Sequence, residues 1–329
     1  MNAYIKQIAS YFPETTLSNA DVTQKVVSEG YPLRENMMDT LIGECERHYA
    51  SKEEQVSDLA VKAAKKIVNG SPESYDLLIF ASACADLIEP ATSNIVQHKL
   101  GLSCPTFDVK NACNSVATAI DIANSMIIAG TARKVLIVSG EKPSDSIKIK
   151  GLNKENIVQH FAALSFGDAG VAIEIEGTEE EKGILYSKSK TFGKYWNLCN
   201  VLGGGSMYPQ DASKLVFSGD TYKLKTVMDK VAPDFIHSCM AESGYALEDV
   251  DLICSHQVSK RTASTIHQHL NIGLDRIMQT FQKFGNTAST SMPIALEQAL
   301  AQGKAKKGDL IMLLGLAAGI NVSVQLVRA

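Results

Sequence analysis

The sequence predicts an α/β protein made of two similar halves. Four short, wholly apolar runs have the length of strands that are buried on both faces of a sheet: "DLLIFAS" (76–82), "KVLIVSG" (134–140), "DLICSHQ" (251–257) and "DLIMLLG" (309–315). Helical patterns lie between them, at Val56–Val68, Ser115–Ala129, Arg261–Leu270 and Pro293–Ala301. This alternation of strands and helices is typical of α/β folds.

A repeat at a nearly fixed offset relates the two halves. "DLLIFAS" matches "DLICSHQ" 175 residues further on, and "VLIVSG" from 135 matches "LIMLLG" from 310 at the same spacing. Between them, Phe107 of "FDVKNACNS" aligns with Phe281 of "FQKFGNTAS", 174 residues on. Three blocks in one order indicate a duplicated strand–loop–helix–strand unit. The acidic stretch "EGTEEEKG" (176–183) marks the divide, so we expect an N-terminal half at 1–175 and a C-terminal half at 176–329.

Composition excludes several classes of function. The 329 residues carry a net charge of −4 without a basic block, so we expect no nucleic-acid partner. Seven scattered cysteines without a CxxC pair argue against a disulfide framework and against a metal site, and they favour a reducing cytoplasm. The N-terminus lacks the layout of a signal peptide, and the apolar runs fall short of the ~20 residues of a membrane span. We therefore expect a cytoplasmic protein without a metal or cofactor.

Three chemically capable side chains stand at the ends of predicted strands or the starts of helices, where α/β folds place their sites. Cys113 follows the extended "TFDV" and precedes a helix, whose positive end favours a thiolate. His256 directly follows a strand, and Asn286 lies in the loop of the second half that corresponds to the loop of Cys113. Each residue also has an ordinary structural interpretation: a packed cysteine, a core histidine, or a turn asparagine.

Several motifs in order resemble the β-ketoacyl-ACP synthases of type III, within the thiolase superfamily. The resemblance is carried by "FDVKNACNS", "FGDAG" (166–170), "SHQVSKR" and "KFGNTASTSMPIAL", and is extended by "GECERHYAS" (43–51), "PATSNIVQHKLG" (90–101) and the C-terminal "LLGLAAGINVSVQLVR". It implies the thiolase fold, five αβαβα layers from two duplicated halves. It also implies an acyltransferase that joins acyl thioesters by Claisen condensation, in lipid or secondary-metabolite biosynthesis.

The resemblance also implies roles for particular residues. The family's Cys–His–Asn triad maps onto Cys113, His256 and Asn286, with Cys113 carrying the acyl group and the other two stabilising an enolate. Backbone amides of Cys113 and of the "LAAG" turn, at Ala318 and Gly319, are expected to hold the acyl oxyanion. Ala317 and Ala318 stand where the family usually has glycines, which restricts the turn.

The departures from the family concern the substrate. Met37, Leu41 and His160 stand at the positions of a tryptophan and two arginines that hold the CoA nucleotide, so a stacking surface and two phosphate-pairing groups are absent. Ser259 replaces the asparagine of the family's "HQAN", and Arg261 remains as a contact for a carrier. We therefore expect a divergent homologue rather than the housekeeping enzyme that uses acetyl-CoA, with acyl carrier protein as a donor alongside or instead of acyl-CoA.

Glu89 in "ADLIEPATSN" stands where the family commonly has a phenylalanine that reaches across a homodimer interface. It is either an exposed carboxylate or a general base that serves the partner's Cys113, as in thiolases that condense without decarboxylation. Two further alternatives are an acyltransferase that passes the acyl group to an alcohol or amine, and an inactive partner subunit or acyl-binding module. The intact triad argues against both.

Overall fold

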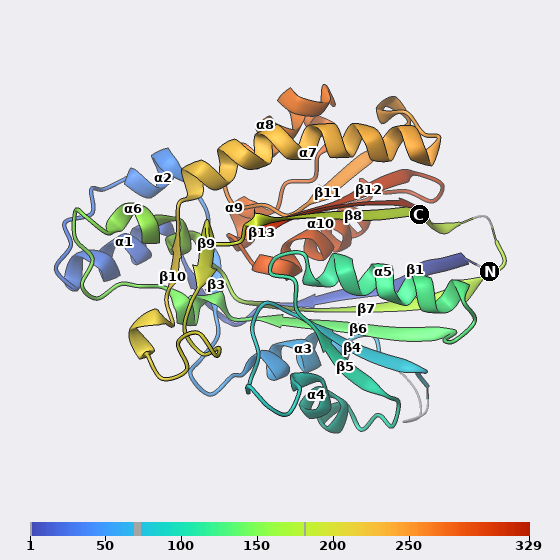
Figure 1. Cartoon of the computed structure of the whole chain (residues 1–329), viewed down its shortest axis with the longest axis horizontal. Helices are drawn as coiled ribbons and strands as arrows, with labels where there is room; N and C mark the ends of the chain where they lie inside the picture. Colours follow the sequence, from blue (N-terminus) through green and yellow to red (C-terminus); the bar gives the residue numbers. More distant parts are fainter. Residues whose placement is uncertain (1, 69–73, 181) are drawn as a thin grey trace.

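Two sheets with helices between them and on their outer faces make up most of the chain (Figure 1). This computed structural model describes residues 2–68, 74–180 and 182–329. The first sheet has the strand order β1 (Asn2–Tyr11), β7 (Ala169–Thr178), β6 (Lys134–Glu141), β4 (Leu77–Ala81) and β5 (Thr106–Val109). The second sheet has the order β11 (Leu252–Ser255), β12 (Leu310–Ala317), β13 (Gly319–Arg328) and β8 (Gly183–Tyr195). Strand β4 runs parallel to β5 and β6, and β11 runs parallel to β12, whereas the other pairs are antiparallel.

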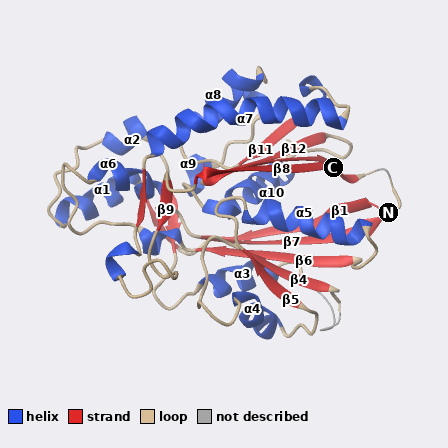
Figure 2. Cartoon of the chain, in the orientation of Figure 1, coloured by secondary structure: helices blue, strands red, loops and turns tan. Residues whose placement is uncertain are grey.

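The helices complete five layers in the order αβαβα, which Figure 2 shows by element type. The outer face of the first sheet carries α3 (Val56–Ala64) and α4 (Thr92–Leu100). The central layer is α5 (Ser115–Ile128) and α10 (Ser291–Ala301), and the outer face of the second sheet carries α7 (Thr221–Ser243) and α8 (Arg261–Leu270). Separate apolar clusters fill the spaces between these layers. The expected thiolase-like architecture is confirmed.

The two halves repeat one strand arrangement. Strands β1, β7, β6 and β4 of the first sheet correspond in order to β8, β13, β12 and β11 of the second. The counterpart of β5 is reduced to a single parallel bridge between Ile253 and Ile277. The chain passes between the sheets after Thr178, so the predicted divide at residues 175 and 176 lies within β7.

The four predicted strands correspond to β4, β6, β11 and β12, and the four predicted helices to α3, α5, α8 and α10. The largest difference concerns α3, which was expected to reach Val68 and ends at Ala64. Beyond it the chain tightens into turns, in which the amide of Ile67 donates to the carbonyl of Ala64 at 3.0 Å. Shorter-range bonds of this kind are common where a helix ends.

Smaller elements form a cap beyond the carboxyl ends of β4, β5 and β6, at the left of Figure 1. They are α1 (Asn19–Ser28), α2 (Met37–Leu41), α6 (Ile157–His160) and α9 (Phe281–Phe284), with the strand pairs β2 (Thr15–Leu17)–β3 (Arg47–Tyr49) and β9 (Cys199–Val201)–β10 (Phe217–Gly219). The cap has its own apolar cluster, which includes Val22, Met38 and Phe281. Across the three described ranges, no helix has the length and apolar character that crossing a bilayer requires.

Close packing of α3 on the first sheet gives a test of this layer. A Cβ on Gly140 of β6 would lie 1.8 Å from the carbonyl oxygen of Val56. We expect Gly140→Ala to lower the free energy of unfolding by about 1–3 kcal/mol, because α3 must move away from the sheet to make room for the added methyl group. Gly193 of β8 has open space around it, so Gly193→Ala is a matched control. Urea denaturation compares the two variants, and equal stability would contradict this packing.

Candidate active site

Cys113 lies in a tight turn between β5 and α5, two residues before the first residue of the helix. Ala112 adopts φ +49°, and the amide of Asn114 donates to the carbonyl of Asn111 at 3.0 Å. The Ser115 hydroxyl accepts from the amide of Asn111 at 2.8 Å and donates to the carbonyl of Ala112 at 2.7 Å. These bonds hold Cys113, which keeps partial exposure, at the amino end of a helix of the central layer.

The second half builds the same turn before α10. Ala288 also adopts φ +49°, and the amide of Thr290 donates to the carbonyl of Thr287 at 3.2 Å. This match places Ser289, rather than Asn286, at the position equivalent to Cys113. Asn286 lies in the corresponding loop, as expected, but three residues earlier.

His256 continues the pairing of β11 with β12 by one residue, since its amide donates to the carbonyl of Leu314 at 3.1 Å. The imidazole is 4% exposed, and Nδ1 has no hydrogen-bond partner within the part of the chain that the structure describes. Burial lowers the pKa of His256 to about 4, with a smaller opposite effect from the backbone of Ala288. The imidazole is therefore neutral near pH 7.

Asn286 is clamped through its backbone and oriented through its side chain. Its amide donates to the carbonyl of Ser165 at 2.8 Å, and its carbonyl accepts from the amide of Gly167 at 3.0 Å. Its Oδ1 accepts from the amide of Ala288 at 3.1 Å. Because Oδ1 is engaged, Nδ2 is the end of the amide that remains to donate to another group.

A series of contacts brings the regions of these three residues together. Asn114, next to Cys113, lies against Gly315, where an added Cβ would approach its Oδ1 to 1.8 Å. Gly315 follows Leu314, whose carbonyl holds the backbone of His256. The Ala288 backbone, which binds Asn286 Oδ1, also acts on the pKa of His256. The loops of both halves thus meet at the central layer.

The protonation of Cys113 differs from the expectation. Burial raises the pKa of its thiol to about 12, and repulsion from Glu141 adds to this shift. The sequence-based expectation considered only the helix terminus, which acts in the opposite sense. Protein surrounds the thiol on most sides, and this desolvation favours the neutral form.

Glu141 is a buried carboxylate that the sequence analysis did not single out. It ends β6, accepts hydrogen bonds from the Ser289 hydroxyl and from the amide of Ala83 (2.8 Å), and is fully buried. Burial raises the pKa of its carboxyl. Its signal in the sequence is a charged residue at the end of the apolar run "KVLIVSGE".

Gln257 was also missed, although it directly follows His256. Its Oε1 accepts from the amides of Thr280 (3.0 Å) and Phe281 (3.2 Å), and its Nε2 donates to the carbonyl of Met278 at 2.6 Å. Its own amide donates to the Ser291 hydroxyl at 3.0 Å. This buried amide therefore joins the end of β11 to the chain that leads to Asn286.

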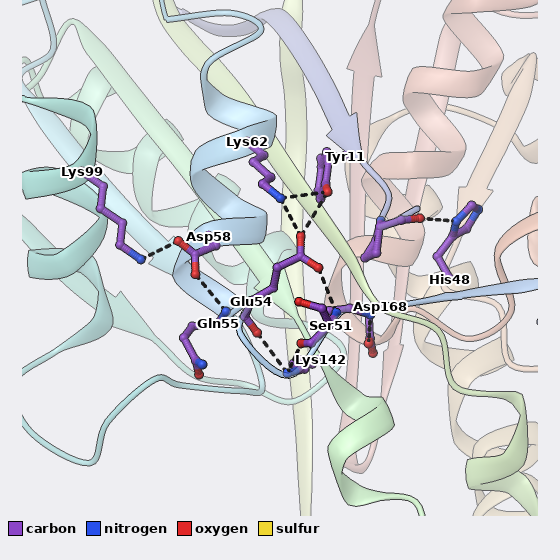
Figure 3. Close-up of polar contacts among 12 residues, drawn as sticks. Tyr11, His48, Ser51, Glu54, Gln55, Asp58, Lys62, Lys99, Lys142 and Asp168 are labelled. Carbon is purple, nitrogen blue, oxygen red and sulfur yellow. Dashed lines mark hydrogen bonds and ion pairs between the residues drawn. The ribbon is translucent and has the colours of Figure 1, made fainter. Parts of the chain in front are cut away.

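A polar network supports the segment that clamps Asn286 (Figure 3). Asp168 accepts from the amide of Ala50 at 2.8 Å and from the Ser144 hydroxyl at 2.6 Å, and burial raises the pKa of its carboxyl to about 6. Lys142 donates to the carbonyls of Ser51 and Glu54, both at 3.0 Å. The network fixes the chain between β3 and α3 against the "FGDAG" segment.

The "LAAG" turn joins β12 to β13. Gly319 has φ +126°, and a Cβ there would lie 2.6 Å from Asn321 Nδ2, so only this position requires glycine. Ala317 and Ala318 are not among the residues with positive φ, so the two alanines fit the turn without strain. Asn321 Nδ2 donates to the carbonyl of Ala318 at 3.1 Å.

The positions expected to contact a nucleotide or carrier lie in the cap and at the start of α8. Met37 and Leu41 are the two ends of α2, and Leu41 is 46% exposed. His160 is buried, and its Nδ1 lies 2.7 Å from the carbonyl oxygen of Phe217. Arg261 is the exposed first residue of α8, and its amide donates to the Ser259 hydroxyl at 3.3 Å.

Glu89 does not join the group of Cys113, His256 and Asn286 within one chain. It is exposed, in a loop in which Leu87 is 49% and Ile88 87% exposed. A role as a base would therefore require a second subunit.

Comparison with known proteins gives one consistent result. Residues 107–193 match the family model of 3-oxoacyl-[acyl-carrier-protein (ACP)] synthase III, and residues 240–329 match the model of its C-terminal part. A β-ketoacyl-[acyl-carrier-protein] synthase III of Neisseria gonorrhoeae is 32% identical over 329 residues, covering 96% of each chain.

Solved structures agree with this result. The 3-oxoacyl-[acyl-carrier-protein] synthase III of Aquifex aeolicus VF5 is similar with a TM-score of 0.86 and 28% identity, covering 99% of this chain and 100% of that chain. A variant of Xanthomonas campestris OleA is similar with a TM-score of 0.89 and 26% identity, covering 100% of this chain and 99% of that chain. The chain belongs to the 3-oxoacyl-[acyl-carrier-protein] synthase III family of Claisen condensing enzymes, which are acyltransferases.

Proposed function

We propose that Cys113 carries the acyl group and that His256 and Asn286 serve the condensation step. The observation that carries this proposal is the turn before α5, which holds a partly exposed thiol at a helix amino end. The loops that carry a neutral imidazole and an oriented amide reach the same central layer. Backbone amides at such a helix terminus, together with the Ala318–Gly319 turn, suit an acyl oxyanion.

Acylation requires the Cys113 proton to leave as sulfur attacks, because the thiol is neutral before reaction. Sulfur forms a bond to the thioester carbonyl carbon, and the C–S bond to the carrier then breaks. His256, neutral and therefore able to accept, passes the proton to the departing thiolate, which leaves as a thiol. The products are acyl-Cys113 and the free carrier thiol.

In condensation, a malonyl thioester loses CO₂ and leaves an enolate. The N–H of neutral His256 and Nδ2 of Asn286 donate to the enolate oxygen. The enolate carbon then attacks acyl-Cys113, the sulfur leaves as a thiolate, and a proton taken up from solvent restores the thiol. The product is a β-ketoacyl thioester.

An acyl carrier protein is the proposed donor in preference to acetyl-CoA. His160, at an expected phosphate-pairing position, is buried and bonded to Phe217, and Met37 and Leu41 provide neither aromatic stacking nor charge. The relatives' names support a carrier-bound substrate, since they are β-ketoacyl-[acyl-carrier-protein] synthases.

A homodimer is also part of the proposal. Strand β5 is an edge strand with Phe107 37% exposed, and the loop from β4 exposes Leu87 and Ile88. An open strand edge beside exposed apolar side chains is a surface that a second subunit would cover.

A non-decarboxylative condensation with Glu89 as base is the second candidate. The OleA structures include variants at a glutamate, a cysteine and a histidine, in the order and at nearly the spacing of Glu89, Cys113 and His256. In that case two acyl thioesters would be joined after removal of an α-proton rather than of CO₂.

Replacing Cys113 and Asn286 one at a time separates the two half-reactions. We expect Cys113→Ala to abolish the acyl adduct and the product. Asn286→Ala should keep the adduct and slow condensation by about 10²–10³-fold, because it removes an enolate donor. Intact-protein mass spectrometry and product release measure the two steps, and Cys239→Ala, at a buried cysteine of α7, is the control. Loss of the adduct in folded Asn286→Ala would contradict this division.

The pKa of Cys113 predicts the pH dependence of its alkylation. Because the thiol is neutral well above pH 7, the iodoacetamide rate at Cys113 should rise about tenfold per pH unit from pH 7 to 9.5, without a plateau. Mass spectrometry of the Cys113 peptide follows the reaction, with a small thiol in the same buffers as reference. A plateau already reached at pH 7 would mean that the helix terminus outweighs burial.

Glu89→Gln discriminates between the two condensations. We expect it to keep acylation and to condense malonyl-carrier at the wild-type rate, because Glu89 is exposed within the chain. Radiolabelled malonyl substrate measures the CO₂ released per product. A variant that forms the adduct but no product, beside a wild type that releases no CO₂, would identify Glu89 as the base.

A further inference from the structure

The turn that carries Cys113 is joined to the opposite half of the chain by its next residue. Asn114 immediately precedes α5, a position at which an asparagine side chain ordinarily accepts from the first amides of its own helix. Asn114 makes no such bond, and its Oδ1 instead accepts from the hydroxyl of Ser323 in β13 at 2.8 Å. Both residues are fully buried. One buried hydrogen bond therefore joins the turn of the first half to the second sheet.

The second sheet leaves room for this bond at a glycine. Gly315 of β12 pairs with Ser323 of β13, and a Cβ on Gly315 would overlap both Asn114 Oδ1 and Ser323 Oγ. Gly315 directly follows Leu314, whose carbonyl accepts from the amide of His256. The bond thus fixes the residue after Cys113 against the strand that supports His256.

The turn before α10 is joined to the first half in the reverse direction. The hydroxyl of Ser289, at the position equivalent to Cys113, donates to the carboxyl of Glu141 at the end of β6. The same carboxyl accepts from the amide of Ala83 at 2.8 Å, so its own half holds it in place. Ser289 Oγ also lies 3.1 Å from Ser139 Oγ of β6. All of these contacts fix the second turn against the first sheet.

The two bonds act on different parts of the candidate site. Asn114 follows Cys113, so a shift of Asn114 moves the sulfur. Ser289 follows Ala288, whose amide donates to Asn286 Oδ1 at 3.1 Å. A shift of Ser289 therefore changes the direction in which Asn286 Nδ2 points, and it leaves the Cys113 turn in place.

We propose that Ser323 and Glu141 are positioning residues of this site, and that each holds the catalytic turn of the opposite half. The inference rests on the proposed function and deepens it. Ser323 acts through Asn114 on Cys113, so it serves formation of the acyl-enzyme. Glu141 acts through Ser289 on Asn286, so it serves condensation. Small displacements of a reacting group or of a donor are enough to slow a reaction strongly.

Removal of one buried hydroxyl at a time tests the proposal. We expect Ser323→Ala to slow formation of the Cys113 adduct at least about tenfold, because Asn114 is released. Ser289→Ala should form the adduct within about threefold of the wild-type rate, and then consume it at least about tenfold more slowly with malonyl-carrier. Time-resolved intact-protein mass spectrometry at saturating thioester measures both rates.

Two substitutions test the other end of the second bond. Glu141→Gln keeps a side-chain oxygen that accepts from the Ser289 hydroxyl, so it should condense within about threefold of the wild-type rate. Glu141→Leu has no acceptor and should slow condensation as Ser289→Ala does. A glutamine variant as slow as the leucine variant would contradict the proposed role of Glu141 as an acceptor for Ser289.

Ser93→Ala is the matched control, because it removes the same atom from a buried serine of α4 in an outer layer. The Ser93 hydroxyl has no hydrogen-bond partner among the residues that the structure describes. We expect wild-type rates for both steps in this variant. Equal slowing of both steps in Ser323→Ala and in Ser289→Ala, or wild-type rates in both, would overturn the proposal.

Failure of the proposed function has a different signature. Wild-type protein that forms no adduct with any thioester would contradict that function, and alkylation of Cys113 by iodoacetamide would still test the positioning. Its rate should rise at least about threefold in Ser323→Ala, because the released turn exposes the thiol, and should stay unchanged in Ser289→Ala. Equal alkylation rates in wild type and Ser323→Ala would show that Ser323 does not hold the Cys113 turn.

Discussion

Burial of α5 and α10 between two sheets is the constraint on which the rest of the structure depends. A helix in this layer has sheet on both sides, so its packing positions carry small or branched apolar residues, such as Ala119 and Ala123 of α5 or Ala295 and Ala299 of α10. Both helices must begin at the same level, beyond the carboxyl ends of the strands. Each therefore follows a tight turn with an alanine at φ +49°, and these two turns bring Cys113 and Asn286 toward one place.

The same burial sets the electrostatics of the site. Cys113, His256 and Glu141 have pKa values shifted toward their neutral forms because protein replaces water around them. Because both the thiol and the imidazole are neutral before reaction, proton transfer is part of the chemical steps rather than an event that precedes them. A neutral imidazole also keeps one N–H to donate, which an enolate oxygen needs.

Much of the fold could be predicted from the sequence because its central elements follow simple rules. Strands buried on both faces are wholly apolar, so β4, β6, β11 and β12 are recognisable, and the 175-residue repeat revealed the duplication. The cap was not predicted, since its short helices and strand pairs lack a long hydrophobic period. The reduction of the counterpart of β5 to one bridge at Ile277 also leaves no pattern in the sequence.

The sequence motifs predict which residues form the candidate site, but they do not predict the environment of those residues. Motifs indicated Cys113, His256 and Asn286, and the structure adds which atoms hold them. The equivalence of Ser289 with Cys113 depends on backbone angles, and the raised pKa of Cys113 depends on packing by distant segments. Gln257 and Glu141 are ordinary residues in the sequence, and their importance arises only from the partners that folding brings to them.

The central claim is that the duplicated turns present one nucleophile, Cys113. It is tested most directly by incubating wild-type protein with a mixed pool of acyl-CoA and acyl-carrier thioesters, followed by intact-mass measurement and peptide mapping. The account predicts a single acyl group per chain, on the Cys113 peptide, with the other six cysteines unmodified. An adduct on another cysteine or on Ser289, or no adduct from any thioester, would contradict it.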